Sequence, residues 1–434
     1  MSSGLQEQFS RISAFSPVTR REPSSHPEPQ DPSNLLTVLG GEIARNRYGE
    51  FLVARQWYSS PERCGADTEV LRLLLSANSE LTEWELQRAA DPEKWLLLDT
   101  ETTGLVGGTG TYAFLIGLAW WESGGIRIEQ LFMRDHDEEH SILLELADRL
   151  AERPVLVTFN GKCFDWPLLQ NRFRMTRQIA TPAFAAHLDL LHPARQLWRL
   201  QIGSVRLTEL EQYVLGAESL GWSRRNDIDS SRIPEFYFEF LRGVAIDGIA
   251  GVFHHNRMDL RGLAALAGRI FRMLSQLEGG EQEPLELYAI SHLLNRHGEC
   301  SKARRVYERC LSMKLPEPIA RRARNEAARL AKRERDFGRA TELWNELASS
   351  SEPSWEALEQ LAIYNERRAR NFNEAARLSR LALAELRRAS RLGLITPERH
   401  EHLSAGIKRR LARLGPKLDL GCAWQSEPLP KMLK

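Results

Sequence analysis

The pattern of apolar and polar positions changes along the chain, and between residues 95 and 274 two kinds of pattern alternate. Short apolar runs typical of buried strands are WLLLD, YAFLIGLAWW, GIRIEQLFM and PVLVTFN. The stretches EEHSILLELADRLAER and DWPLLQNRFRM carry apolar residues at helical spacing, and ESGG between the second and third runs predicts a hairpin turn. The order β-β-β-α-β-α, followed mainly by helices, predicts an α/β domain with a mixed sheet.

The segments around this domain have other patterns. Residues 1–34 are rich in Ser, Pro and charged residues and poor in large apolar ones, which predicts a disordered tail. Residues 35–94 have the pattern of a short β element followed by helical pieces, and we expect an N-terminal extension that packs on the α/β domain. Residues 416–434 are expected to form a C-terminal tail.

Beyond Glu281 the strand signals end and helical segments repeat. GECSKARRVYERCL, RDFGRATELWNELA and RNFNEAARLSRLAL align with Ala303, Ala340 and Ala375 in register, 37 and 35 residues apart. A period of about 34 residues with a small side chain at a helix contact is typical of tetratricopeptide-like helical hairpins, although the Trp and Gly of the full consensus are missing. We therefore predict an all-α repeat domain over residues 282–415, which would offer a groove to a protein partner.

Composition narrows the class of protein. The 59 Lys and Arg residues nearly balance the 58 Asp and Glu residues, so the total charge does not indicate a nucleic-acid binder. Arg-rich stretches at residues 301–339 and 366–413 fit either a basic face for a polyanion or a solvated helix surface. Five cysteines without CxxC spacing indicate neither a disulfide framework nor a zinc site. No stretch approaches the roughly 20 apolar residues of a membrane helix, and no secretory signal is evident, so we expect a cytoplasmic protein with no membrane attachment.

The segment WLLLDTETTGLVGGTGTYAFLIG, residues 95–117, carries the first candidate chemistry. A phosphate-binding P-loop needs GxxxxGK[ST] and a dinucleotide loop needs GxGxxG, and this segment has glycines but neither pattern. Asp99 and Glu101 stand two residues apart at a strand end, so both carboxylates can lie on one face and converge on hard cations. We therefore predict a metal-binding carboxylate pair, with the glycines forming a turn near it.

Two further acids follow along the chain. Asn160 ends a strand and Asp165 begins the next helix, where capping of that helix is the alternative role for the carboxylate. Asp259 lies in a helical pattern, and His255, four residues before it, is about 40° around the axis and on the same face. His254, five residues before Asp259, is about 140° away. If the helix began only after the two histidines, this geometry would not distinguish them.

These residues resemble a known pattern. DTETTGL, FNGKCFD and HNRMD match, in order and local context, the three motifs of the DEDD 3′-5′ exonucleases, which have the ribonuclease H-like fold. The longer strings DTETTGLVGGTGTYAFLIG, VTFNGKCFDWPLL and LDLLHPARQLW resemble the YprB-like predicted exonucleases of bacteria, in which such a domain is joined to tetratricopeptide-type helices. The resemblance covers roughly residues 35–274, and it implies a ribonuclease H-like mixed sheet flanked by helices over residues 95–274.

The resemblance also implies an activity, the metal-dependent 3′-5′ hydrolysis of phosphodiester bonds in single-stranded DNA or RNA. Four carboxylates would hold two divalent ions, Mg²⁺ or Mn²⁺, for an in-line attack by water. By motif position, Asp99 would bridge the ions, Glu101 and Asp259 would complete the water-activating site, and Asp165 would act partly through bound water. The rival hypothesis is a catalytically inactive adaptor that binds nucleic acid or protein partners, and a polymerase-like proofreading unit is a third.

The remaining site predictions concern water and substrate. The family has Tyr four residues or His five residues before the last acid, and this chain has His at both positions. We favour His255 over His254 as the group that orients or deprotonates the water. Asp189 is expected either to support the ligands or to have a structural role only. The residues expected to contact substrate are Thr102, Thr103, Gly104, Asn160, Arg224 and Arg225.

Overall fold

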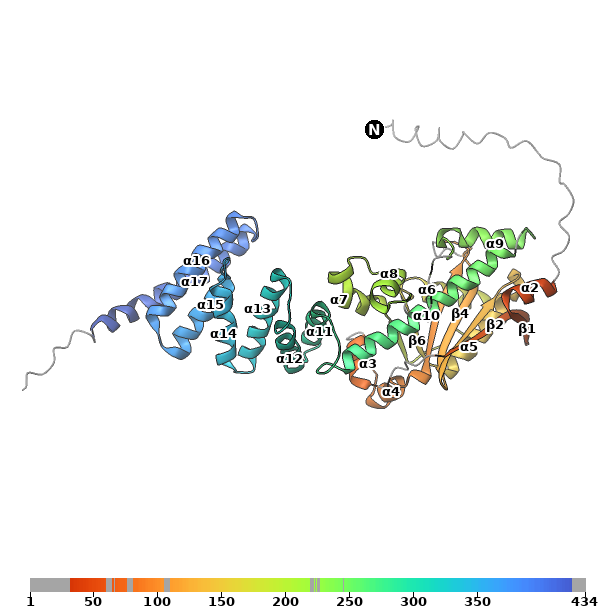
Figure 1. Ribbon diagram of the computed structural model, residues 1–434, viewed down its shortest axis with the longest axis horizontal. Coiled ribbons are helices and arrows are strands. Elements are labelled where there is room, and N and C mark those ends of the chain that lie inside the picture. Colours follow the sequence, from red (N-terminus) through yellow and green to blue (C-terminus); the bar gives the residue numbers. More distant parts are fainter. Residues whose placement is uncertain are drawn as a thin grey trace, which may run out of the picture.

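The computed structural model describes residues 32–59, 65, 67–75, 81–104, 110–218, 222, 224, 227–244 and 246–423. Residues 32–34 and 418–423 are described by their backbone only. An α/β part and an array of helices lie end to end (Figure 1). Most of the two predicted tails lies outside the described residues. The chain is helical from Pro32, however, and the last helix continues past residue 416 to Ala423.

A seven-stranded mixed sheet forms the centre of the α/β part, in the order β1-β2-β5-β4-β3-β6-β7. Among the first five strands in this order, β1, β2, β5, β4 and β3, neighbours pair antiparallel. The strands β3, β6 and β7 pair in parallel. The strands are β1 Gly41–Asn46, β2 Gly49–Ser59, β3 Trp95–Thr102, β4 Ala113–Glu122, β5 Gly125–Phe132, β6 Val155–Thr158 and β7 Ala186–Asp189. The predicted mixed sheet is confirmed. Its parallel strands bring the ends of β3, β6 and β7 to the same side of the sheet.

The sheet extends further than the sequence pattern indicates. The short β element expected in residues 35–94 is a hairpin of β1 and β2, and β2 joins the sheet by pairing with β5. β7 is a strand where the sequence indicates only a short apolar run, because four residues carry too little alternation to identify one. The ESGG turn is as predicted: Glu122 pairs with Gly125, and Gly124 has a φ of 76°.

Helices cover both faces of the sheet. They are α2 Pro32–Leu39, α3 Thr68–Leu74, α4 Glu83–Ala89, α5 Glu139–Glu152, α6 Asp165–Thr176, α7 Leu191–Ile202, α8 Leu207–Leu210, α9 Ile233–Leu241 and α10 Asp247–Ser275, with single-turn segments η1 Pro92–Lys94, η2 His136–Glu138, η3 Glu211–Leu215 and η4 Ser230–Arg232. Trp95 and Leu97 of β3 face a core shared with α7 and the second half of α10. Leu96 and Leu98 face the opposite core, with α5, α6 and α9. This alternation decides which face of the sheet the acids at the end of β3 occupy.

The rest of the chain is an all-α array in which consecutive helices pack on one another (Figure 1). Its helices are α11 Pro284–Arg296, α12 Cys300–Leu311, α13 Glu317–Arg333, α14 Phe337–Ala348, α15 Trp355–Tyr364, η5 Asn365–Ala369, α16 Phe372–Arg391 and α17 Pro397–Ala423. Ala303, Ala340 and Ala375 occupy the fourth position of α12, α14 and α16, and all three are fully buried. A small side chain at this helix contact therefore recurs in the predicted register.

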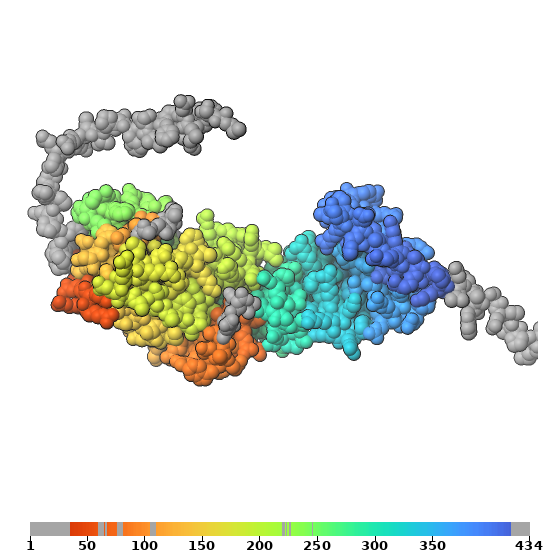
Figure 2. Space-filling view, turned by 180° about the vertical axis from the view of Figure 1, so that it is seen from behind, coloured from red at the N-terminus to blue at the C-terminus, as the bar shows by residue number. Residues whose placement is uncertain are grey.

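The α/β part and the helical array share one hydrophobic core. Buried side chains continue from β3 and the second half of α10 into α11 and onward to α16. At the junction the indole Nε1 of Trp198 donates to Glu286 Oε1 at 2.8 Å, and Arg269 Nη2 lies 3.1 Å from the same oxygen. Figure 2 shows the two parts in contact along this boundary. Among the helices that the structure describes, none combines the length and apolar character needed to cross a membrane.

Candidate active site

Asp99 and Glu101 lie on the side of β3 that faces α10. Residues 95, 97, 99 and 101 share one face because side chains alternate along a strand, and Trp95 and Leu97 on that face are fully buried. Glu101 is 8% exposed. The Oδ2 atom of Asp99 accepts a hydrogen bond of 2.9 Å from Asn256 Nδ2 in α10. The two acids thus lie on one face, as predicted, between the sheet and a long helix.

The loop between β6 and α6 brings Asp165 to the same place. Thr100 donates to Asp165 Oδ1 from its backbone nitrogen at 3.1 Å and from its hydroxyl at 2.6 Å. Asn160 adopts a φ of 68°, and a Cβ on Gly161 would lie 2.5 Å from the Thr158 side chain. The chain therefore makes a tight turn that only glycine permits at residue 161.

Asp189, at the end of β7, holds this turn in place. Its carboxylate accepts hydrogen bonds from the backbone nitrogens of Asn160 at 2.8 Å, Lys162 at 3.1 Å and Leu191 at 3.1 Å. The side chain is 5% exposed. It contacts the backbone of the turn that precedes Asp165, so its place in the structure is that of a support for the turn.

α10 contributes Asp259 and His255. Because the helix begins at Asp247, both histidines lie inside it and the argument from helical spacing applies. His255 Nε2 lies 3.7 Å from Asp259 Oδ2, and His255 Nδ1 lies 2.9 Å from each oxygen of Asp227. For His254, no hydrogen bond to these acids is present among the described residues. The structure places His255 at the acids and His254 to the side.

Arg224 lies in the site but is engaged by protein carboxylates. Its guanidinium donates to Glu211, to Asp227 Oδ2 at 2.9 Å and to Asp259 Oδ1. This arrangement differs from the expectation that Arg224 contacts a phosphate, because three carboxylates already surround the cation. Arg225 lies outside the described residues.

The TTGL segment after Glu101 uses its polar groups within the chain. The Thr102 hydroxyl donates to Gly104 O at 2.9 Å, and the Thr103 hydroxyl accepts from Tyr112 N at 3.0 Å. These bonds connect the end of β3 to the start of β4. The predicted glycine turn falls mostly on residues 105–109, which lie outside the part of the chain that is described.

The acids are buried close together and raise one another's pKa. Burial, followed by the charges of Asp259, Glu101 and Asp165, holds the pKa of Asp99 well above its usual range. Burial and neighbouring acids raise the pKa of Glu101 to about 8 against the opposing effect of His255. The pKa of Asp165 is also raised, by burial first, although hydrogen bonds from Thr100 oppose the change.

Two cations offset part of this negative charge. Burial alone would lower the pKa of His255, but the hydrogen bond to Asp227 and the charges of Asp259 and Glu101 raise it to about 9. The pKa of Arg224 is raised as well, because its pairing with Glu211 and Asp259 outweighs burial. The pKa of Asp227 is lowered, since hydrogen bonds from His255 and Arg224 outweigh its own burial. These shifts favour the charged forms of the imidazole and the guanidinium at neutral pH.

Comparison with known proteins places this arrangement in a family. Residues 96–271 match the RNase_H superfamily. The uncharacterized protein YprB of Bacillus subtilis (strain 168) is 30% identical over 291 residues, which cover 66% of this chain and 68% of YprB. The chain belongs to the YprB family. Its sheet and flanking helices are thus a ribonuclease H-like domain, followed by a helical region, as the resemblance implies.

A solved structure gives a weaker likeness. The family B DNA polymerase from the hyperthermophilic archaeon Pyrobaculum calidifontis aligns with 49% of this chain and 28% of its own, at 17% identity and a TM-score of 0.33. A likeness at this level carries no argument about the fold or the function of the YprB family member.

The donor set of the YprB-type site fits a hard divalent cation. Asp99, Glu101, Asp165 and Asp259 offer only carboxylate oxygens. Burial and neighbouring acids raise the pKa values of Asp99, Glu101 and Asp165, and a bound cation would relieve the repulsion among these acids. Across the described residues, no group of three or more His, Cys, Asp and Glu side chains forms a ready metal site. Protein donors contact three of the acids: Asn256 at Asp99, Thr100 at Asp165 and Arg224 at Asp259. A cation that takes Asp259 as a ligand would compete with the Arg224 guanidinium.

Three polar residues at the site escaped the sequence predictions. Asn256 is fully buried and binds Asp99, Gln130 of β5 binds Asn256 at 2.8 Å, and Asp227 binds His255. Asn256 stands three residues before Asp259, so the helical spacing that identifies His255 also identifies Asn256. Gln130 is a polar residue within an otherwise apolar run. Asp227 lies in an irregular segment before η4, where no periodicity could have indicated it.

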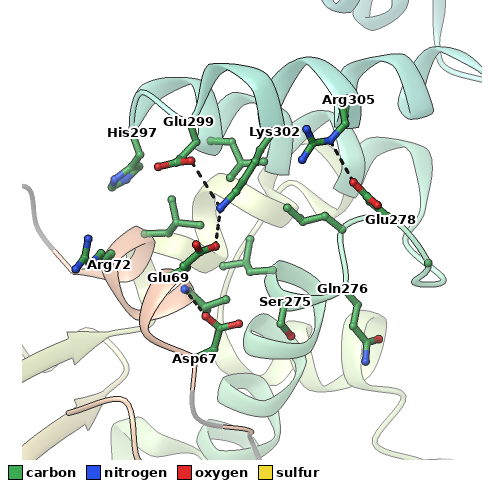
Figure 3. Close-up of a pocket in the computed structure, with 16 residues that line it drawn as sticks. Asp67, Glu69, Arg72, Ser275, Gln276, Glu278, His297, Glu299, Lys302 and Arg305 are labelled. Atoms are coloured by element: carbon green, nitrogen blue, oxygen red, sulfur yellow. Dashed lines mark hydrogen bonds and ion pairs between the residues drawn. The ribbon is translucent and has the colours of Figure 1, made fainter. Parts of the chain in front are cut away.

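The YprB family member also has a cavity of about 910 Å³ away from these acids, where α3, the end of α10, α11 and α12 meet. Figure 3 shows Lys302 reaching towards Glu69 and Glu299, and Arg305 reaching towards Glu278. Lys302 and Arg305 are paired with acids of this cavity, Arg72 is paired with Glu83 outside its lining, and none of the four site carboxylates lines it. It is therefore separate from the candidate active site.

Proposed function

We propose that this protein is a metal-dependent 3′-5′ exonuclease of the DEDD type that hydrolyses single-stranded DNA or RNA. The observation that carries the proposal is the meeting of Asp99, Glu101, Asp165 and Asp259, from β3, α6 and α10, in a ribonuclease H superfamily domain. The polarity and the preference for a single strand follow the family resemblance of the three motifs.

The side chains have distinct roles in this proposal. Asp99, Glu101, Asp165 and Asp259 would hold two divalent ions, Mg²⁺ or Mn²⁺. Bound ions of this kind activate water and stabilise the leaving oxygen of a phosphodiester. His255 is oriented by Asp227 at Nδ1, so its Nε2 is directed towards Asp259 and is available to orient the attacking water.

Substrate contacts are proposed for the segments that surround the acids. Thr102, Thr103, Gly104 and Asn160 lie at the ends of β3 and β6, beside the carboxylates. Arg224 would contribute positive charge near Asp259, and the predicted contact of Arg225 with phosphate belongs to the same proposal. The helical array, with its recurrent buried alanines, would offer a tetratricopeptide-type groove to a protein partner.

One observation favours a second function, that of an inactive adaptor. The guanidinium of Arg224 is paired with Asp259, so one of the four acids already has a protein cation as its partner. If this ion pair persisted in the presence of metal, the site would lack a ligand, and the domain would serve as a platform for nucleic acid or protein.

Hydrolysis of 3′- and 5′-end-labelled single-stranded DNA and RNA tests the proposal. The reactions contain Mn²⁺, Mg²⁺ or chelator, and they compare the wild type with Asp99→Asn and with Asp148→Asn, which changes an exposed acid of α5. We expect shortening from the 3′ end that needs metal, persists in Asp148→Asn and is lost in Asp99→Asn. Absence of cleavage by well-folded wild type, judged by circular dichroism, would favour the adaptor.

A further inference from the structure

A row of polar groups crosses three strands of the sheet beneath α10. Asp99 of β3 pairs with Gly117 of β4, and Gly117 pairs with Gln130 of β5. Asn256 lies over the middle of this row and is fully buried. It donates from Nδ2 to Asp99 Oδ2 at 2.9 Å, and its Oδ1 accepts from Gln130 Nε2 at 2.8 Å. One helix residue thus joins the outer two members of a cross-strand row.

Gly117 makes room for this contact. A Cβ at residue 117 would lie 2.2 Å from Asn256 Oδ1 and 2.7 Å from Nδ2, which is far inside the contact distance. Both of its neighbours in the row carry polar side chains, so the glycine leaves a gap between them that the Asn256 amide fills. The position of Asn256 is therefore built into the sheet as well as into the helix.

The direction of every hydrogen bond in this row is determined. Arg257 can only donate, and its Nη1 lies 3.3 Å from Gln130 Oε1, which must accept. The Gln130 Nε2 atom therefore donates, both to Phe253 O at 2.9 Å and to Asn256 Oδ1. Asn256 is left with Nδ2 as the donor to Asp99. Neither amide can flip without breaking bonds at both ends.

Arg257 supplies a positive charge at the far end of the row. Its side chain forms no ion pair with any of the residues that the structure describes, and it is half-buried. Two amides connect this cation to the Asp99 carboxylate, so their dipoles are aligned with the donor end towards the acid. Such alignment directs a donor towards Asp99 and fixes one of its oxygens.

We propose that Asn256 is a positioning residue that holds the Asp99 carboxylate in one rotation, with Gln130 and Arg257 fixing the Asn256 amide. This inference rests on the proposed function, since it assigns Asp99 as the acid that receives the cation. One oxygen of Asp99 is committed to the amide, which leaves the other oxygen available to a cation. Groups that hold a metal-binding carboxylate in this way commonly contribute 10–100-fold to metal affinity.

Titration calorimetry with Mn²⁺ and no nucleic acid tests the inference. Asn256→Leu keeps the volume and removes the donor, and we expect the Mn²⁺ dissociation constant to rise by about 10–100-fold. Gln130→Glu does not touch Asp99 but can no longer donate to Asn256, and Gly117→Ala displaces Asn256 sterically. Both Gln130→Glu and Gly117→Ala are also expected to weaken Mn²⁺ binding, so the test does not depend on the folding of one variant. Asn345→Asp and Gly406→Ala, in the helical array, are controls.

A second readout separates positioning from a structural role. In hydrolysis assays, the Mn²⁺ concentration for half-maximal rate should rise with the dissociation constant in Asn256→Leu, while the rate at saturating Mn²⁺ largely recovers. If Asn256 served stability alone, Asn256→Leu would have a lower melting temperature, but its Mn²⁺ dissociation constant and its Mn²⁺ concentration for half-maximal rate would be unchanged. That result would overturn the inference.

The outcomes also separate this inference from the proposed function. If the wild type binds Mn²⁺ and Asn256→Leu binds it more weakly, but no nucleic acid is cleaved, the positioning role stands and the nuclease proposal falls. If the wild type cleaves and the variants bind Mn²⁺ as it does, only the positioning role falls. If the wild type does not bind Mn²⁺ at all, both fall.

Discussion

Four carboxylates and two cations share a small volume at the end of β3, and their charges determine what each residue can do. The pKa values of Asp99, Glu101 and Asp165 are raised because burial and mutual repulsion disfavour the charged forms. His255 and Arg224 offset part of this charge. Such a cluster is unfavourable for the fold by itself, and clusters of this kind occur where function requires them.

The first prediction concerns the stability of the protein without metal. Asp99→Asn removes one buried carboxylate from a repelling group and keeps an oxygen that can accept from Asn256. In chelator we expect the variant to be more stable than the wild type, by about 1 kcal/mol in the free energy of unfolding. Urea denaturation at pH 7 measures this. A variant less stable than the wild type would show that Asp99 serves the core rather than the site.

The second prediction distinguishes the two histidines. His255 contacts Asp227 and faces Asp259, whereas His254 makes no hydrogen bond with the acids among the described residues. His255→Ala should therefore lower kcat by about 100-fold or more, and His254→Ala should change it by only a few-fold. Single-turnover hydrolysis at saturating Mn²⁺ gives both values. The reverse order would assign the water-orienting role to His254.

At the scale of elements, the site depends on the ends of the parallel strands β3, β6 and β7. Asp189 at the end of β7 holds the turn after β6 through backbone nitrogens, and that turn leads to Asp165. His187 of β7 connects the same strands, with its Nε2 2.9 Å from the Thr158 hydroxyl of β6. The pairing of short strands therefore positions one of the four acids.

The third prediction is a pH dependence that arises at this pairing. Burial and then the charge of Lys162 lower the pKa of His187 from 6.5 to about 4. The folded state therefore favours the neutral His187 ring. The stability that the neutral ring contributes is complete above pH 6.5 and is lost as the pH falls towards 4. Between pH 7 and pH 5 this loss should be about 1–2 kcal/mol. Urea denaturation of wild type and His187→Gln at both pH values tests it: equal losses in the two proteins would contradict the assignment to His187.

At the scale of the whole molecule, the nuclease-type domain and the helical array form one body. Their cores are continuous, and the buried Glu286 of α11 accepts from Trp198 of α7 and pairs with Arg269 of α10. At the edge of the same junction Lys302 of α12 lies 2.5 Å from Glu69 of α3. A partner held by the array would consequently have a fixed position relative to the candidate active site.

The fourth prediction tests this connection. Glu286→Ala leaves the Arg269 charge and the Trp198 N–H without their acceptor, at a cost of about 2–4 kcal/mol. Glu374→Ala removes an exposed pair with Arg377 in α16 and should cost less than about 1 kcal/mol. Thermal melts followed by tryptophan fluorescence and by circular dichroism should coincide in both variants, with a lower Tm for Glu286→Ala. Two separate transitions in the wild type would show that the parts unfold independently.

The sequence by itself determined the features that repeat within one segment. The two-residue period of β3 puts Asp99 and Glu101 on one face, and four-residue spacing in α10 brings His255 to Asp259. The buried alanines were indicated by a repeat of similar helical segments, each with Ala at the fourth position of its helix. Backbone geometry fixes these relations inside each element, so they can be read without knowing where the element lies.

Only the tertiary structure decided which distant residues complete the site. Asn256 meets Asp99 across 157 positions because strand register places Gly117 beside Asp99 and because α10 crosses at that glycine. Arg224, expected to face a phosphate, is instead surrounded by three acids, two of them from other elements. Such contacts depend on how strands pair and how helices cross. These relations are set by the packing of side chains that lie far apart in the sequence, and no local periodicity encodes them.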